Sequence, residues 1–180
     1  MNGSYNYYRF LQGDEDGLVE IIREYKDGLI FYLNTFTNDI FVAEELAMDT
    51  FAKIGIIKLK DKKYASFKTW LYTIGKNTAI DYLRKNSKKN IPLDDKNIFS
   101  ESILETILKD ERKIIIHKAM NNLKMEYKQV LWLAYFEKFS NKEISIIMNK
   151  KVHNVETFLY RAKKSLKKEL EMEEYFYENL

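Results

Sequence analysis

The sequence contains no cysteine, a single proline (Pro92) and only six glycines among its 180 residues. The absence of cysteine excludes disulfides, thiolate zinc sites and cysteine nucleophiles. Because glycine and proline supply most turns of β-rich folds, their scarcity favours a fold built of helices. No apolar run reaches the roughly 18 residues of a membrane-spanning helix, and the first ten residues lack the basic and apolar blocks of a signal peptide. We therefore expect a cytoplasmic protein without membrane insertion.

Groups that carry catalysis or bind metal ions are also scarce. The two histidines, His117 and His153, are far apart in the sequence and have no further ligands near them. There is no glycine-rich phosphate loop, and the scattered carboxylates lack the spacing of a paired acid and base. We expect no cofactor and no metal site, and we do not expect an enzyme.

The charge of the chain is distributed unevenly. The formal net charge is only +3, although residues 1–60 hold six basic and ten acidic residues. Residues 61–90 hold eight basic and two acidic residues, whereas residues 91–110 hold two and five. Residues 111–169 hold fourteen basic and six acidic residues. Two basic zones separated by an acidic stretch indicate two nucleic-acid contacts joined by a linker.

The most informative stretch lies near the C-terminus and predicts two helices with a tight turn between them. Ser140 and Glu143 have the spacing of a capping box, and Phe139 and Ile144 flank the same helix start as a hydrophobic staple does. Asn149 is suited to end this helix, because asparagine accepts the left-handed conformation that closes many helices.

The second helix of this stretch combines one apolar face with many basic positions. The apolar positions recur at helical spacing and are Val155, Leu159, Ala162, Leu166 and Leu170. The other faces carry Arg161, Lys163, Lys164, Lys167 and Lys168. A short helix, a turn and a longer basic helix are typical of a helix-turn-helix, whose second helix enters the DNA major groove. The alternative is an ordinary helical hairpin with a solvated basic face.

A second informative stretch mixes aromatic and basic side chains along one predicted helix, which Ser66 is placed to cap. The residues of this mixed surface are Lys68, Trp70, Tyr72, Lys76, Asn77, Arg84 and Lys85. Rings that stack on unpaired bases and cations that follow phosphates are typical of single-strand nucleic-acid binding. The alternative is that Trp70 and Tyr72 are core residues; Trp70 could also wall a groove without stacking.

The N-terminal part predicts two further helices. One begins near residues 13–16, where acidic side chains suit the positive end of the helix dipole, and the other follows Asp39. The second helix has an acidic outer face formed by Glu44, Glu45 and Asp49. Such a face is either solvated or a docking surface for a basic partner.

Three stretches carry a family resemblance. They are VAEELAMDTF at 42–51, SFKTWLYTIGKNTAIDYLRK at 66–85 and VETFLYRAKKSL at 155–166. With these motifs in this order, the chain resembles bacterial RNA polymerase sigma factors of the extracytoplasmic-function (ECF) group of the sigma-70 family. The resemblance covers nearly the whole chain, and the three motifs together are far more specific than any one of them.

The resemblance implies an all-α fold of two small helical domains joined by a flexible linker. Residues 1–87 would form a domain like sigma region 2, and residues 108–175 a domain like sigma region 4 that contains the helix-turn-helix. The linker would span residues 88–107, which include Pro92.

The function implied is that of a sigma factor, which directs core polymerase to specific promoters and promotes initiation. The first domain would bind core RNA polymerase and help to melt the minus-ten element, and the second would read the duplex minus-thirty-five element. The expected partners are core polymerase and promoter DNA, and an anti-sigma factor is left open. One alternative is a helix-turn-helix regulator that binds duplex operators without engaging polymerase; a second is a helical module that binds only proteins. A duplex-only regulator would not need the mixed surface at 66–85.

The resemblance also suggests site residues, one set for each contact. Those for the upstream element are Asn154, Glu156, Thr157, Phe158, Arg161, Lys163 and Lys164. Those for the melted downstream element are Trp70, Lys76, Asn77, Arg84 and Lys85. Those for polymerase are Glu45, Asp49 and Phe51. Asn77 matches the family position that contacts a flipped base, and its amide offers both a donor and an acceptor.

Three positions depart from the family pattern. Glu156 and Phe158 stand where relatives often have basic residues, and Lys151 replaces the small or hydroxyl residue that usually opens the recognition helix. Glu156 would accept a hydrogen bond from a cytosine amine, and Phe158 would either pack on a thymine methyl or belong to the core. The promoter sequence therefore cannot be transferred from the family.

Overall fold

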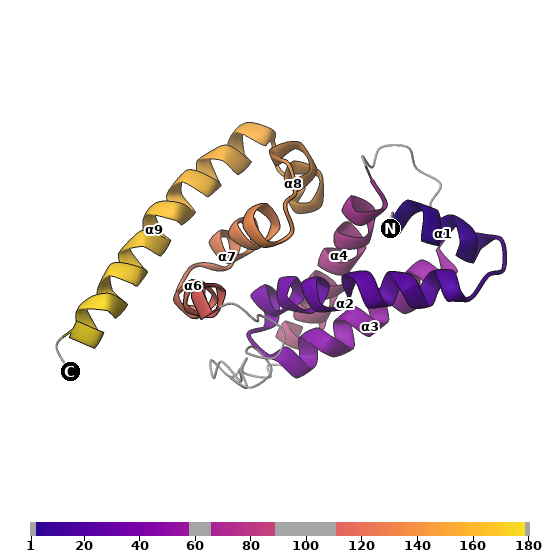
Figure 1. Cartoon of the computed structure of the whole chain (residues 1–180), viewed down its shortest axis with the longest axis horizontal. Helices are drawn as coiled ribbons and strands as arrows, with labels where there is room; N and C mark the ends of the chain where they lie inside the picture. Colours follow the sequence, from indigo (N-terminus) through magenta and orange to yellow (C-terminus); the bar gives the residue numbers. More distant parts are fainter. Residues whose placement is uncertain (1–2, 58–65, 89–110, 179–180) are drawn as a thin grey trace.

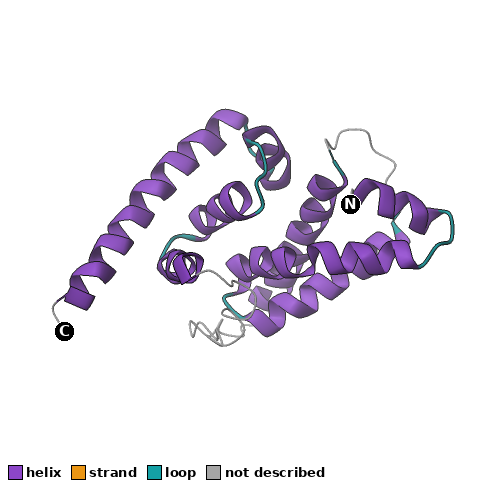
Figure 2. Cartoon of the chain, viewed as in Figure 1, coloured by secondary structure: helices purple, strands orange, loops and turns teal. Residues whose placement is uncertain are grey.

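The computed structural model describes residues 3–57, 66–88 and 111–178 (Figure 1). All regular structure within these ranges is helical (Figure 2), which confirms the predicted all-α class. The linker predicted at 88–107 lies, apart from its first residue, outside the described residues. The helices are α1 (Gly3–Leu11), α2 (Asp16–Thr37), α3 (Ile40–Ile56), α4 (Phe67–Lys88), α6 (Glu111–Asn121), α7 (Met125–Leu131), the π-helical turn η1 (Trp132–Phe136), α8 (Asn141–Met148) and α9 (Val152–Glu178).

Helices α1 to α4 pack together as a first bundle (Figure 1). The predicted start of α2 near residues 13–16 is confirmed, and α2 ends at Asn38, which adopts the left-handed conformation with φ of 52°. Asp39 then caps α3, because its carboxylate accepts from the backbone N–H groups of Phe41 and Val42 at 2.9 and 3.2 Å. The chain therefore reverses within two residues, and α2 and α3 lie side by side.

Helix α1 was not predicted, yet it completes the first bundle. Tyr7 is buried, and its ring lies 5.0 Å from that of Phe67 and 5.2 Å from that of Trp70, between ring centroids. Gly17 allows α1 to approach α2, since a Cβ at Gly17 would lie 2.7 Å from the backbone nitrogen of Phe10. The spacing of Tyr7 and Phe10, three residues apart, is the sequence signal that could have indicated this helix.

Helix α4 begins at the predicted cap and packs on α2. The hydroxyl of Ser66 accepts from the backbone N–H of Thr69 at 3.2 Å. Leu71 is fully buried, and a Cβ at Gly75 would lie only 2.9 Å from the side chain of Leu29 in α2. The close approach of α4 to α2 therefore depends on a position without a side chain.

The helix-turn-helix begins with the capping box that the sequence predicts. The backbone N–H of Glu143 donates to Ser140 Oγ at 3.3 Å, and the backbone N–H of Ser140 donates to Glu143 Oε2 at 2.9 Å. Phe139 and Ile144 are both buried, as expected for the staple. Asn149 ends α8 in the left-handed conformation, with φ of 52° and ψ of 50°, which confirms that prediction.

The turn η1 links the C-terminal helices to α2. The backbone N–H of Glu137 donates to the carbonyl of Trp132 at 3.1 Å, five residues back, and the Trp132 indole stacks on Phe136 with ring centroids 4.2 Å apart. The Trp132 Nε1–H donates to the carbonyl of Gly28 in α2 at 3.1 Å. One continuous set of buried apolar side chains therefore runs through both groups of helices.

Two features are absent from residues 3–57, 66–88 and 111–178. None of these helices is long and apolar enough to cross a membrane. Nor do these ranges contain a group of three or more acidic, histidine or cysteine side chains able to hold a metal ion.

Candidate nucleic-acid and polymerase interfaces

The local sequence fixes which face of α9 is exposed. After Asn149, the backbone N–H of Lys150 donates to the carbonyl of Ser145 at 2.9 Å and closes the turn between α8 and α9. Val155 and Ala162 are fully buried, as the predicted apolar face requires. The opposite face of α9 therefore points to solvent and is available to a duplex.

Most residues predicted to contact the upstream element lie on that exposed face. The exposed members of the set are Asn154, Glu156, Arg161, Lys163 and Lys164. Thr157 is half-buried, and its hydroxyl donates to the carbonyl of His153 at 3.0 Å. Tyr160, which the sequence analysis missed, has 70% of its surface exposed and lies one turn beyond Glu156. The i, i+4 spacing of these two residues is the signal that could have identified Tyr160.

The ring of Phe158 contacts other side chains of the C-terminal domain. Its ring is half-buried and lies 6.3 Å, between centroids, from that of Tyr127 in α7, in a T-shaped arrangement. The ammonium of Lys150 lies 4.9 Å from the centroid of the same ring. These contacts favour the core-packing alternative for Phe158 over a contact with a thymine methyl.

The middle and end of α4 present the cations and the amide predicted to contact the melted strand. Asn77, Arg84 and Lys85 are exposed, and Arg84 pairs with Asp81 at 2.9 Å. Lys76 is half-buried, and its pKa is lowered mainly by burial and secondly by the positive charge of Lys150. An exposed amide with nearby cations can bind both a base edge and the phosphates beside it.

Trp70 is the buried member of the set predicted to contact the melted strand. A seven-residue spacing places Trp70 and Asn77 on the same side of a helix, but Trp70 is only 5% exposed. Tyr7 of α1 covers its indole, with ring centroids 5.2 Å apart, whereas Asn77 stays exposed. This burial favours the core alternative for Trp70 over stacking on a base.

The acidic face of α3 is exposed as predicted, but Phe51 is not part of it. Glu45 and Asp49 are exposed, whereas Phe51 is only 2% exposed. At 100° per residue, Phe51 lies about 200° around the helix from Asp49 and faces the core. The apolar residues that do accompany the acids are Phe41 and Met48, which are 56% and 39% exposed.

The helical protein thus has one basic face suited to duplex DNA, one face suited to unpaired strands and one exposed acidic face. Comparison with models of known protein families agrees with this description. Residues 21–89 match the model of sigma-70 region 2, and residues 113–166 match that of sigma-70 region 4.

Similar proteins narrow the class further. The chain is 30% identical over 150 residues to the ECF RNA polymerase sigma factor SigM of Bacillus subtilis. The matched region covers 82% of this chain and 91% of SigM. It is 26% identical over 172 residues to SigW of the same organism, covering 88% of this chain and 91% of the relative. The chain therefore belongs to the ECF group of the sigma-70 family and is an RNA polymerase sigma factor, which directs transcription initiation at promoters.

Two solved structures share the fold. CnrH, solved in complex with the cytosolic domain of CnrY, has a TM-score of 0.67 at 17% identity and covers 93% of this chain and 96% of its own. The sigma factor RpoE of Bartonella quintana, solved with the anti-sigma factor NepR, has a TM-score of 0.60 at 16% identity and covers 84% of this chain and 95% of its own. At these identities the likeness shows the fold alone.

Proposed function

We propose that the three surfaces divide the work of initiation between two domains, at residues 1–87 and 108–175. The exposed acidic face of α3 docks on core polymerase, the exposed end of α4 captures the melted minus-ten strand, and α9 reads the duplex minus-thirty-five element. The chain supplies binding energy and no catalysis, and it acts in the cytoplasm, where polymerase is found.

The observation that carries this proposal is the exposure of Asn77, Arg84 and Lys85 on a helix separate from the helix-turn-helix. A regulator that binds only duplex operators needs α9 but has no use for a second surface that pairs an amide with cations. The alternative without polymerase is therefore not favoured. Promoter-specific run-off transcription with core polymerase tests the proposal as a whole.

The docking face gives the first prediction. Reversing Glu45 and Asp49 to lysine should reduce affinity for core polymerase by roughly tenfold or more, since charge complementarity steers and supports association. Binding of isolated upstream-element DNA should not change. Affinity is measured by fluorescence anisotropy with labelled sigma factor at physiological salt.

Two further variants in α3 separate the contribution of charge to core binding from that of apolar contacts. Met48→Ser should also weaken core binding, because Met48 is exposed beside Asp49, whereas Phe51→Leu should leave it unchanged because Phe51 lies in the core. Unaltered core affinity after the double reversal would mean that this face is merely solvated.

The recognition helix gives the second prediction. Glu156→Ala should relax the preference for one base pair of the upstream element by about 1–3 kcal/mol, because a base-edge contact specifies sequence. Lys164→Ala should instead weaken all sequences alike and lower the steepness of the salt dependence, as loss of a phosphate contact does. Competition binding with a set of single-base variants at several salt concentrations distinguishes the two. If Glu156→Ala leaves the preference unchanged at every base, Glu156 does not read the element.

The structure also supports an anti-sigma factor as a partner. A groove of about 990 Å³ lies between α2 and the C-terminal helices. The apolar side chains that line it include Phe31, Trp132, Tyr135, Phe136, Leu166 and Leu170. The charged residues of its lining are Asp27, Glu137, Lys138, Lys163, Lys167 and Glu171. An apolar groove with charged edges suits an amphipathic helix, and one of the solved structures with this fold was determined with an anti-sigma factor bound.

A further inference from the structure

Glu156 differs from the other acidic side chains in and around the helix-turn-helix. Within residues 137–171, all of which the structure describes, every other carboxylate has a partner. The pairs are Lys68 with Glu137, Thr69 with Glu143, Asn122 with Glu169 and Lys167 with Glu171, at 2.8, 3.1, 3.2 and 3.5 Å. Glu156 is exposed and has no such partner among the described residues. Because like charges repel, a carboxylate on a face that approaches DNA phosphates is favourable only if it meets a donor at the bases.

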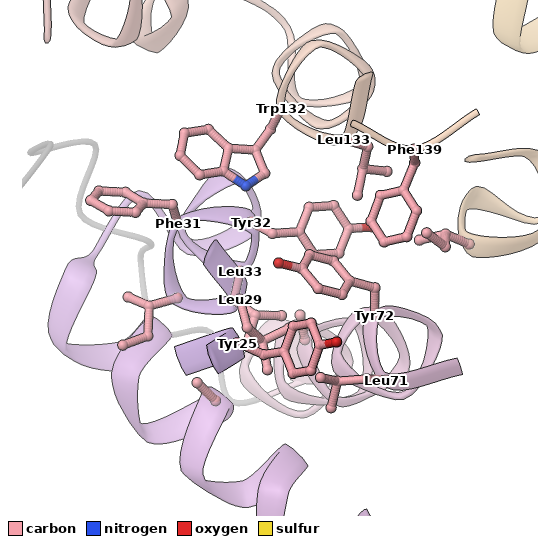
Figure 3. Packing of buried hydrophobic residues seen from close by; sticks show 14 of the residues in the cluster. Tyr25, Leu29, Phe31, Tyr32, Leu33, Leu71, Tyr72, Trp132, Leu133 and Phe139 are labelled. Atoms are coloured by element: carbon pink, nitrogen blue, oxygen red, sulfur yellow. The ribbon is translucent and has the colours of Figure 1, made fainter. Parts of the chain in front are cut away.

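Two of these pairs anchor the start of the helix-turn-helix on α4. The ammonium of Lys68 also donates to the backbone carbonyl of Glu137 at 2.8 Å, and it lies 4.8 Å from the centroid of the Phe139 ring. The rings of Phe139 and Tyr72 lie beside each other, with centroids 5.1 Å apart (Figure 3). The carboxylates at this contact are therefore used within the molecule, whereas that of Glu156 is available to another molecule.

His153 faces directly away from the core of the helix-turn-helix. Val155 and Ala162 are fully buried, and at 100° per residue they lie about 200° and 180° around α9 from His153. His153 is exposed, and Glu156 follows one turn later and is exposed too. Side chains three positions apart on a helix have Cβ atoms about 5–6 Å from each other. The two residues therefore present a donor and an acceptor side by side.

The backbone holds His153 in a regular first turn of α9. The hydroxyl of Thr157 donates to the carbonyl of His153 at 3.0 Å. The backbone N–H groups of Asn154 and Val155 donate to the carbonyl of Lys151 at 2.9 and 3.1 Å. The N-terminal residues of a recognition helix are those that contact base edges in the major groove. His153 thus lies where the helix would meet the bases.

A G·C base pair offers the complementary groups in the major groove. Cytosine presents an amine donor, and guanine presents two acceptors, N7 and O6. The carboxylate of Glu156 only accepts hydrogen bonds, so it suits the amine but is repelled by the guanine acceptors beside it. An imidazole has at least one N–H in either protonation state and can donate to N7. The two side chains together match both halves of the base pair, whereas Glu156 alone matches one.

We propose that His153 is a further specificity-determining residue, whose imidazole donates to N7 of the guanine paired with the cytosine that Glu156 contacts. The inference rests on the proposed function, because it requires α9 to enter the major groove of the upstream element. It predicts a G·C pair at this position of the element. It also predicts that His153 and Glu156 act as a unit, so that the effects of replacing them are not additive.

The test uses the full-length chain bound to core polymerase and duplexes with randomised upstream elements. The wild type should select a G·C pair that His153→Ala and Glu156→Ala each select more weakly. Replacing that guanine with 7-deazaguanine, which lacks the N7 acceptor, should weaken wild-type binding about fivefold or more and should not weaken binding by His153→Ala. The same replacement at a guanine outside the element is the matched control. Binding is measured by fluorescence anisotropy of labelled duplexes.

A second variant separates a base contact from a structural role. His153→Gln keeps an N–H donor at this position and should retain part of the sensitivity to 7-deazaguanine. Helicity by circular dichroism should be equal in all variants, since both side chains are exposed. A His153→Ala chain that selects the same guanine as strongly, or that stays as sensitive to its replacement as the wild type, would overturn the role of His153. A wild-type holoenzyme that selects no upstream sequence would instead overturn the proposed function.

Discussion

Replacing Trp70 with alanine is expected to lower the free energy of unfolding by about 3–5 kcal/mol, the usual cost of removing a large aromatic side chain from a core. The indole is 5% exposed, and its centroid lies 5.2 Å from that of Tyr7 and 5.7 Å from that of Phe67. Its removal leaves a cavity where α1 and α4 meet. Urea unfolding followed by circular dichroism measures the loss.

The control for this variant is Trp70→Phe, which keeps an aromatic ring in the site and should cost much less. Promoter melting by Trp70→Phe should resemble that of the wild type, because the indole is not available to the bases. A Trp70→Ala chain that is as stable as the wild type and yet fails to melt promoters would show that Trp70 stacks on DNA after all.

The Asn77→Ala variant should lose promoter melting while keeping its fold. Unstacking a base costs a few kcal/mol, which contacts to the captured base must offset. Loss of one good base contact is worth about 1–3 kcal/mol, so open-complex formation should fall by about 5- to 150-fold. Permanganate footprinting of the minus-ten element, with wild-type and variant chains bound to core polymerase, measures the change.

A template with the bubble already open separates base reading from other roles of Asn77. The defect of Asn77→Ala should appear with the correct unpaired minus-ten sequence and vanish with a shuffled one. Asn86→Ala removes the same type of side chain near the end of α4 and serves as the matched control, with little effect expected. An equally deep defect on both sequences would exclude base reading by Asn77.

Much of the local structure could be predicted because it depends on residues close together in the sequence. The helix ends at Ser140, Asn149 and Ser66 depend on bonds within one turn. The capping box of Ser140 was identified from the spacing to Glu143, and Asn149 and Ser66 were identified from their residue types. The buried face of α9 followed from the 3.6-residue period in the same way.

Burial of single side chains was harder to predict, because it depends on which element covers a helix. Trp70 is buried since α1 lies over it, and α1 itself was missed. The family resemblance grouped Phe51 with Glu45 and Asp49, although the helical angle places Phe51 on the opposite side of α3.

The contact between the domains could not be predicted at all. Lys68 and Glu137 are 69 positions apart in the chain, and nothing in either local sequence indicates the other. Such long-range pairs depend on how complete domains fit together, which no local sequence pattern indicates.

Promoter-specific run-off transcription tests the central claim most directly. Core polymerase is supplied with duplex templates from the genome that encodes this chain, with and without the chain, and transcripts are resolved by length. We predict discrete transcripts that require the chain. The amount of transcript should decrease when Glu45 and Asp49 are reversed to lysine. It should also decrease with Asn77→Ala, more steeply on duplex than on pre-melted templates. Identical transcripts with and without the chain, although the chain binds duplex DNA, would contradict its role as a sigma factor.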